Sequence, residues 1–205
     1  MKPALPAPND NLQKGTPMGA KQSREVAIPW TELALVGCLI GVDVIARLLP
    51  HAPGFTPVAV TALFAGTILR SRALALVVPL AAMLAGDAVL GFYDWRVMSV
   101  VYVAAALPVL VGWLTRGWRA PLVFVPAILS CSLLFFVATN FAVWAFGGLY
   151  PHNLEGLAEC YIAALPFLRN AVAGDLFWAT LLFGGYHLAR AIPLHHWLRR
   201  SWGNG

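Results

Sequence analysis

Charged residues are scarce in this chain of 205 residues. Only 11% of the residues are charged, whereas 60% are hydrophobic and the mean hydropathy is +0.72. A soluble domain carries about 25% charged residues, so this chain has too few of them to cover a surface that faces water. The shortage of charge excludes a soluble globular enzyme and a disordered chain.

Cysteine is also scarce, since the sequence contains three. Three cysteines do not make the disulfide framework of a small secreted domain. Cys38 and Cys131 lie in apolar runs, and we interpret them as small apolar side chains. Cys160 is expected on the outer side, where it could be a buried filler, a reactive thiol or a soft metal ligand beside His152. Because no spacing typical of a metal site occurs, we expect no metal site and no cofactor.

Long apolar runs fill the chain from Trp30 onward. A bilayer core about 30 Å thick takes about 20 helical residues, and the backbone can cross lipid only as helices or as a closed barrel. The runs predict an all-α, polytopic membrane helix bundle of about six transmembrane helices, forming one domain over residues 28–192. The expected spans are 30–49, 55–69, 73–92, 97–115, 121–148 and 168–189. The conformation of the outer loop 149–167 stays open.

The segments on either side of this domain are more polar. Residues 1–27 contain four prolines and few large apolar side chains, which predicts a flexible cytoplasmic arm. Residues 193–205 combine Trp197 and Leu198 with Arg199 and Arg200, which predicts an amphipathic cytoplasmic tail.

The basic residues predict the orientation of the bundle. With the N-terminus inside, eleven of the 14 lysines and arginines lie on the cytoplasmic side, and Arg47, Arg96 and Arg169 lie outside. This bias follows the positive-inside rule, and an even number of spans places both termini in the cytoplasm. The net charge of +5 is therefore a topology signal. We expect the lipid bilayer as a partner and no nucleic acid.

Polar residues gather in the outer parts of the predicted spans. An ionisable side chain in the hydrocarbon region costs about 2.5–3.5 kcal/mol on insertion scales, so it normally faces a partner or a wet cavity. Several such residues at one depth predict an outward-facing polar pocket that binds a small molecule. The expected pocket residues are Asp43, Arg47, Asp87, Asn140, Arg169, Asn170 and Asp175.

The same residues could form a static network that only holds the bundle together. Asp43 and Arg47 are one helical turn apart and could neutralise each other. Arg169 and Asp175 could do so through a neighbour. A structural network has no reason to avoid the inner halves of the spans, however, so the asymmetry of the whole set favours a binding site.

A remote alternative is an intramembrane aspartic protease. Ala85-Gly86-Asp87 and Ala173-Gly174-Asp175 repeat one triplet in two spans, and aspartic proteases activate water with two carboxylates that share a proton. Leu84 and Val172 stand where presenilin-type proteases have a further glycine. Because glycine before aspartate could simply allow close helix packing, we expect no enzymatic activity.

Gly37 and Gly41 have the spacing that lets two helix backbones approach closely in a membrane. The partner backbone could belong to the same bundle or to another subunit. We therefore treat both glycines as candidate docking residues.

Several stretches of the sequence together point to a known family. They are Arg47-Leu-Leu-Pro-His51, Phe55-Thr-Pro57, Asp87 to Tyr93, Asn140-Phe-Ala-Val-Trp144, and Tyr150 through Cys160-Tyr161, Ala164-Leu-Pro-Phe167 and Arg169-Asn170 to Leu176. With these stretches, roughly residues 40–190 resemble an uncharacterised bacterial family of small integral membrane proteins, a domain of unknown function. That family is itself similar to the substrate-binding S components of energy-coupling-factor vitamin transporters.

The resemblance implies a bacterial inner-membrane protein that binds a vitamin-like solute. The polar set would then line the pocket, with Trp144 and Tyr161 as stacking walls. Gly37 and Gly41 would dock a separate membrane coupling subunit. The competing function is that of a non-catalytic accessory subunit of a larger membrane complex, with the polar set buried against a partner.

Overall fold

The computed structural model describes residues 30–116 and 121–191, together with Met1, and gives side chains from Val125 onward in the second stretch. This part of the chain is all-α, as the apolar runs predict. The predicted arm and tail lie outside it, apart from Met1. The six helices are α1 (Trp30–Leu48), α2 (Val58–Ile68), α3 (Arg72–Leu90), α4 (Trp95–Leu114), α5 (Pro121–Phe146) and α6 (Leu154–Ala191).

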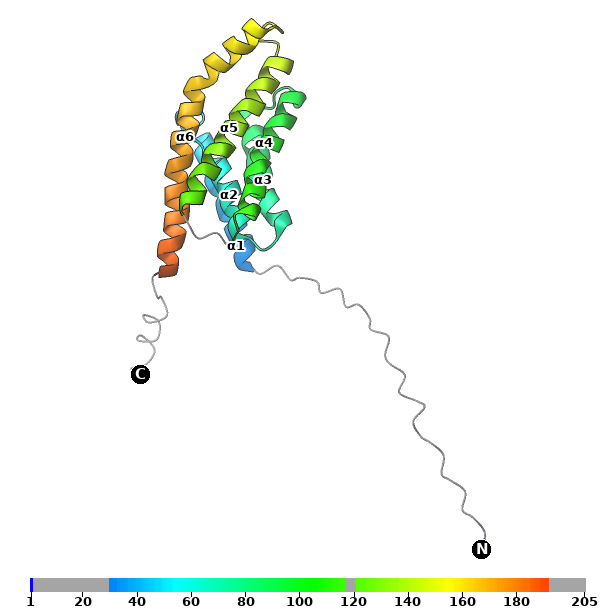
Figure 1. Ribbon diagram of the computed structural model, residues 1–205, viewed down its shortest axis with the longest axis vertical. Helices are drawn as coiled ribbons and strands as arrows, with labels where there is room; N and C mark the ends of the chain where they lie inside the picture. The colour runs from blue at the N-terminus through cyan, green and yellow to red at the C-terminus, as the bar shows by residue number, and fades with distance from the viewer. Residues whose placement is uncertain (2–29, 117–120, 192–205) are drawn as a thin grey trace.

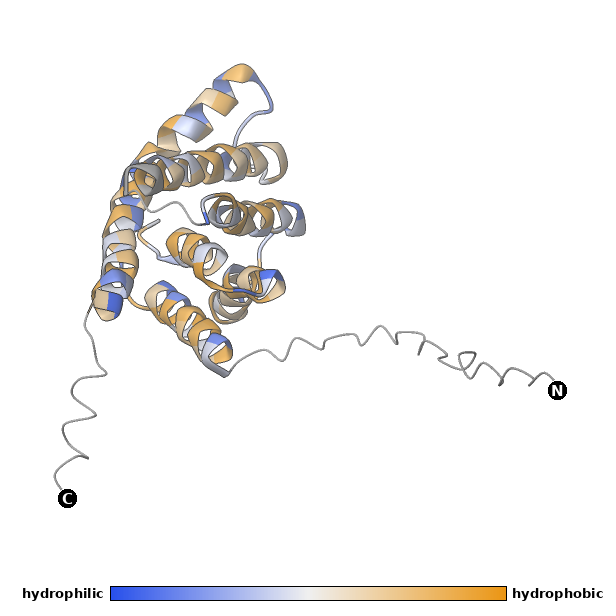
Figure 2. Cartoon of the chain, turned by 60° about the horizontal axis from the view of Figure 1, so that its bottom comes forward, coloured by the Kyte–Doolittle hydropathy of each residue, from blue (hydrophilic) through white to orange (hydrophobic). Residues whose placement is uncertain are grey.

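Three of these described helices are long and apolar enough to cross a membrane: α3, α4 and α5 from Val125 onward. Large apolar side chains such as Leu84, Val103 and Leu133 are exposed on their outer surfaces. Figure 2 shows hydrophobic residues along most of the length of the helices. An apolar surface of this extent is expected where helices face lipid rather than water.

Helix α2 is shorter than its predicted span of 55–69. Its 11 residues extend about 16 Å at 1.5 Å per residue, which is about half the thickness of a bilayer core. Residues 49–57 before it are not helical, because proline at positions 50, 53 and 57 interrupts the helical hydrogen-bonding pattern. The described part of the chain therefore contains one half-length helix among longer ones.

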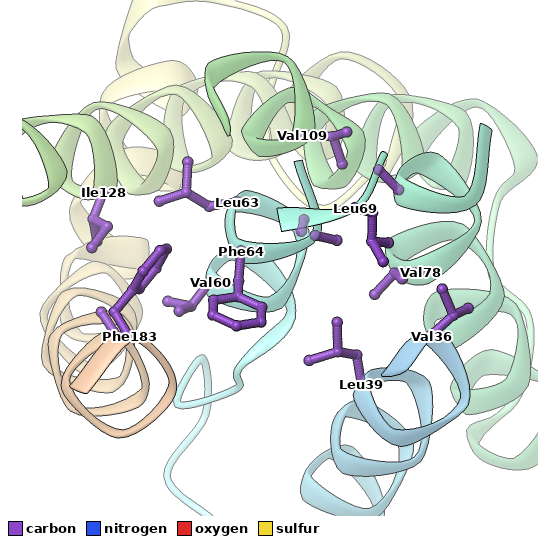
Figure 3. Close-up of a cluster of buried hydrophobic side chains, with 14 residues drawn as sticks. Val36, Leu39, Val60, Leu63, Phe64, Leu69, Val78, Val109, Ile128 and Phe183 are labelled. Atoms are coloured by element: carbon purple, nitrogen blue, oxygen red, sulfur yellow. The ribbon is translucent and has the colours of Figure 1, made fainter. Parts of the chain in front are cut away.

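Helix α2 lies at the centre of the bundle and contacts each of the other five helices described. Eight of its 11 residues are buried. In Figure 3, Leu63 and Phe64 of α2 lie between Phe183 of α6, Val109 of α4 and Leu39 of α1. The apolar core of the bundle is thus built around a helix too short to cross the membrane by itself.

Helices α2 and α4 touch through their backbones at Gly66 and Gly112. A Cβ atom on Gly66 would overlap the carbonyl oxygen of Val109, and one on Gly112 would overlap that of Leu63. Only glycine leaves room for this approach.

Arg116 caps the C-terminal end of α2. Its Nη2 donates hydrogen bonds to the carbonyl oxygens of Gly66, at 2.9 Å, and of Leu69. These carbonyls lack helical partners and carry partial negative charge, which a guanidinium satisfies. Helix α1 begins and α6 ends at this same end of the bundle (Figure 1). It is the end that the basic residues predict to be cytoplasmic.

Helix α6 is longer than the predicted span of 168–189, because it includes most of the outer loop. It begins at Leu154, where Asn153 Oδ1 accepts a hydrogen bond from the amide of Gly156 at 2.8 Å. It then continues through Pro166 to Ala191. Its first turns lean away from the direction of the remainder in Figure 1, as expected where proline removes a helical hydrogen bond.

Candidate functional site: a cavity beside the first turn of α2

A cavity of about 380 Å³ lies beside the N-terminal end of α2. Each of the six described helices contributes to its wall, as do Gly54 and Thr56 before α2 and Tyr93 between α3 and α4. Pockets for small molecules typically enclose about 300–1,000 Å³. The cavity therefore has room for a small organic molecule.

Most of the cavity wall is apolar. Phe135 and Phe136 of α5 and Phe167 of α6 contribute aromatic rings, while Met83 and Val101 contribute aliphatic surface. The polar groups among them are few. Such a lining is typical of ligand sites, in which apolar surface supplies contact area and a few polar groups fix orientation.

The loop before α2 is held against α6, so that irregular backbone forms one side of the cavity. Gly54 has φ of +87°, and a Cβ atom there would lie 2.9 Å from the carbonyl oxygen of Phe167. Asn170 Nδ2 donates to the Pro53 carbonyl at 3.2 Å. Gly54 and Thr56 line the cavity, and non-helical backbone at membrane depth is tolerated where it lines a cavity.

Arg47 reaches the cavity from α1 and is bonded to α3. Its Nη2 lies 2.6 Å from Asp87 Oδ1, and its Nη1 donates to Met83 Sδ at 2.6 Å. The Tyr102 hydroxyl of α4 donates to Asp87 Oδ2 at 3.0 Å. Asp87 is buried behind Arg47 and does not line the cavity. The network joins three helices at the cavity wall.

Asp175 lines the cavity from α6. The Ser132 hydroxyl of α5, which also lines the cavity, donates to Asp175 Oδ2 at 2.6 Å. Asp175 is only 4% exposed. Within the described parts of the chain, no basic side chain lies within 4 Å of its carboxylate.

Asp43 is fully buried in α1 but lies outside the cavity wall. Its Oδ2 accepts a hydrogen bond from Thr61 of α2 at 2.7 Å, and its Oδ1 has no hydrogen-bond partner among the described residues. The direct pairing of Asp43 with Arg47, considered as a structural alternative, is not formed. Arg47 is paired with Asp87 instead.

Of the remaining expected pocket residues, one lines the cavity and the others lie elsewhere. Asn140 lines the cavity, but its Nδ2 donates to the Phe136 carbonyl of its own helix at 2.8 Å. Trp144 Nε1 donates to the Pro151 carbonyl at 2.9 Å, and the Tyr161 hydroxyl donates to the Val137 carbonyl at 2.7 Å. Neither Trp144 nor Tyr161 lines the cavity. Arg169 is exposed. Of the nine expected residues, the structure brings Arg47, Asn140 and Asp175 together.

Sequence reasoning missed Ser132 and Tyr102, and it named Tyr93 in the stretch Asp87 to Tyr93 without including it among the expected pocket residues. A serine or tyrosine in an apolar run carries no signal of its own, because hydroxyls commonly bond to their own helix. Tyr93 lies between two helices and lines the cavity. Burial and the nearby charge of Asp87 raise the pKa of Tyr93 above its ordinary value, so its phenol is a neutral donor at pH 7.

In each of the two Ala-Gly-Asp triplets, the glycine leaves space for a neighbouring group. A Cβ atom on Gly86 would lie 2.6 Å from Arg47 Nε, and one on Gly174 would lie 3.1 Å from the Cα atom of Phe55. The aspartates that follow them lie on α3 and α6, which do not contact each other. Each carboxylate bonds to different partners, so the arrangement differs from a carboxylate pair that shares a proton.

Cys160 is buried, and its Sγ lies 3.4 Å from the carbonyl oxygen of Asn140. The His152 ring packs against Trp144 instead. In the portion of the chain with described side chains, no three His, Cys, Asp or Glu residues are grouped so that they could hold a metal ion.

The described structure contains apolar helices that are long enough to cross a membrane, and a cavity lies among the helices. Both features are compatible with a helical membrane protein. Residues 28–196 match the family model described as a family of unknown function, DUF6580. The chain therefore belongs to this family. No curated protein and no solved structure matches it.

Proposed function

We propose that this protein is a multi-pass protein of the bacterial cytoplasmic membrane that binds a small solute in the cavity. The observation that carries the proposal is the mixed lining, in which Arg47 and Asp175 face the same cavity as three phenylalanine rings. Charged side chains inside an apolar bundle are costly unless they have a function or a partner. Their position on a cavity wall favours recognition of a ligand over packing alone.

Transport of the solute is the finer part of the proposal, and the sequence resemblance to S components supports it. A protein of that kind passes its vitamin-like solute across the membrane together with a coupling subunit. Gly37 and Gly41 lie on the outside of α1, where a Cβ atom on either would have no neighbour within 4 Å. This strip of α1 is open to the close approach of another helix.

The same strip also favours the second candidate, a non-catalytic accessory subunit of a larger membrane complex. The two functions differ in the role of the cavity. A solute-binding protein loses its ligand when the cavity is filled, whereas an accessory subunit keeps its partner after the same change. The separate bonding of Asp87 and Asp175 gives the protease alternative no support.

Native mass spectrometry of the protein, gently extracted from its own host, tests the proposal. We expect a stoichiometric small molecule on the wild-type protein. Ala171 lines the cavity, so Ala171→Phe should fill it and remove the bound molecule. Ala163 is exposed on the same helix, so Ala163→Phe is the matched control and should retain the molecule.

Two results would count against the proposal that the cavity binds a solute. One is a wild-type protein released with a protein partner and no small molecule, which would favour the accessory subunit. The other is a small molecule that remains bound to Ala171→Phe as tightly as to the control, since the molecule would then lie elsewhere.

A further inference from the structure

The charges around the cavity indicate which kind of solute it takes. Resting on the proposed function, we propose that the ligand is an organic cation. Its positively charged nitrogen pairs with Asp175, and its apolar part lies against Phe135, Phe136 and Phe167.

Asp175 is the negative group of the cavity that lacks a counter-ion. The Ser132 hydroxyl donates to Asp175 Oδ2, and among the described residues no other hydrogen bond to this carboxylate is formed. Asp175 lines the cavity and is nearly buried, so a cation that reaches it must come through the cavity. A buried carboxylate held by a single hydroxyl is costly, and an ammonium group at hydrogen-bond distance offsets that cost.

Arg47 is the positive group on the cavity wall, but its charge is already used. Nη2 pairs with Asp87, Nη1 contacts Met83, and Nε is buried over Gly86 without access to a ligand. The pair of Arg47 and Asp87 has no net charge. An anionic ligand would have to compete with Asp87 for this guanidinium.

The first turn of α2 is the other positive feature. Val58 and Ala59 line the cavity, and Pro57, the N-cap residue of the helix, provides no side-chain hydrogen bond to this end. A helix N-terminus carries about half a unit of positive charge, which is less than the negative charge of the Asp175 carboxylate when it is ionised. The balance around the cavity is therefore negative. The amides of α2 suit a neutral acceptor group on the same ligand.

The apolar wall fits the rest of such a molecule. Three phenylalanine rings line the cavity close in sequence to the charged and hydroxyl groups, with Phe135 and Phe136 on the helix of Ser132 and Phe167 on the helix of Asp175. Aromatic faces attract cations as well as apolar groups. A small inorganic cation would leave most of this surface without contact, so an organic cation matches the cavity better.

Three probes of similar shape and different charge test the inference. They are 2-phenylethylamine, which is cationic at pH 7, 2-phenylethanol, which is neutral, and phenylacetate, which is anionic. Their dissociation constants are measured by calorimetry on the full chain in lipid nanodiscs, with empty nanodiscs subtracted. We expect the amine to bind at least about tenfold more tightly than the alcohol, since close charge pairs in buried sites exceed 1.4 kcal/mol, and the carboxylate to bind most weakly.

Two variants identify the source of the preference. Asp175→Asn keeps the shape of the side chain and its bond from Ser132 but removes the charge, so the ratio between amine and alcohol should fall to about one. Ser132→Ala keeps the charge and should keep a preference for the amine. Ala171→Phe should abolish binding of all three probes.

The inference is overturned if the wild-type protein binds the amine no better than the alcohol, or if the preference survives in Asp175→Asn. The wild-type comparison decides the matter even if Asp175→Asn does not fold. The proposed binding function is judged separately, by the host-derived molecule and its loss in Ala171→Phe. A cavity that binds the neutral or anionic probe best is still a solute site, but for another class of solute.

Discussion

Arg47 of α1 and Asp87 of α3 form a largely buried ion pair, with 2.6 Å between Nη2 and Oδ1, although 40 positions separate them in the sequence. The Asp87 side chain is only 3% exposed. The pair connects α1 to α3 at the cavity wall, and the Tyr102 hydroxyl extends it to α4. The two residues stabilise the fold only as a pair, because either charge alone would be left without an opposite charge.

Removing one partner of this pair should destabilise the protein strongly. Asp87→Ala leaves the Arg47 guanidinium without its counter-ion, and such a loss typically costs about 3–5 kcal/mol. Replacing both residues by apolar ones, as Arg47→Met with Asp87→Leu, should cost clearly less than Asp87→Ala alone. Thermal unfolding of the purified variants in nanodiscs measures the differences.

The exposed pair of Arg96 and Asp94 provides the control, because its atoms are 3.8 Å apart and its side chains are 51% and 36% exposed. Arg96→Ala should cost at most about 1 kcal/mol. An Asp87→Ala variant as stable as Arg96→Ala would show that the buried pair is unimportant for folding.

The all-α fold could be predicted because the apolar composition of each run is a local property. The length of α2 could not be predicted in the same way. Phe55 and Pro57 continue the apolar run of residues 55–69, and hydropathy does not distinguish a membrane span from a half-length helix buried at the centre of a bundle. That distinction depends on the five helices that surround α2.

The candidate site could be predicted only in part, because the sequence indicates the depth of a residue in its span but not its contacts with other helices. The depth of Arg47, Asn140 and Asp175 in their spans placed them near one another, and all three line the cavity. Arg169 is six positions before Asp175, so the two lie roughly 120° apart around the helix, and Arg169 is exposed. The partners Ser132, Tyr102 and Thr61 depend on tertiary contacts between helices, for which a single sequence contains no local signal.

Thr61 should contribute to stability through Asp43. Its hydroxyl donates to Asp43 Oδ2 at 2.7 Å, and Asp43 has no other hydrogen-bond donor among the described side chains. Thr61→Val preserves the shape of the side chain but leaves the buried carboxyl group without its hydrogen-bond donor, which should cost about 1–3 kcal/mol. The measurement is again the unfolding temperature in nanodiscs.

Thr67 is a matched control on the same helix, since its hydroxyl donates to the Phe64 carbonyl of α2 itself at 2.8 Å. Thr67→Val removes a bond within one helix, and we expect a change below about 1 kcal/mol. Equal effects of the two substitutions would indicate that Asp43 does not depend on Thr61.

The contact between α2 and α4 should not tolerate a methyl group at Gly66. A Cβ atom there would meet the backbone of Val109, which has no flexible end that could move aside. Overpacking of this kind typically costs about 1–3 kcal/mol. Gly184 of α6 has nothing within 4 Å of its Cβ position, so Gly184→Ala should stabilise its helix by roughly 0.5–1 kcal/mol. Opposite signs are expected, and a loss of stability in both variants would argue against the close approach of α2 and α4.

The outer strip of α1 should matter for a partner and not for the fold of this chain. Gly37 and Gly41 have no neighbour within 4 Å of their Cβ positions, so Gly37→Leu and Gly41→Leu should leave the unfolding temperature of the purified protein almost unchanged. If another membrane subunit docks through this strip, the added side chains would separate the two backbones.

A tagged wild-type chain should then co-purify a membrane partner from its host, and the leucine variants should lose it. Gly184→Leu, on an open position of α6, serves as the matched control and should retain the partner. Retention of the partner by all three variants would place the docking surface elsewhere on the bundle. A large drop in the unfolding temperature of the α1 variants would show that Gly37 and Gly41 pack within the chain.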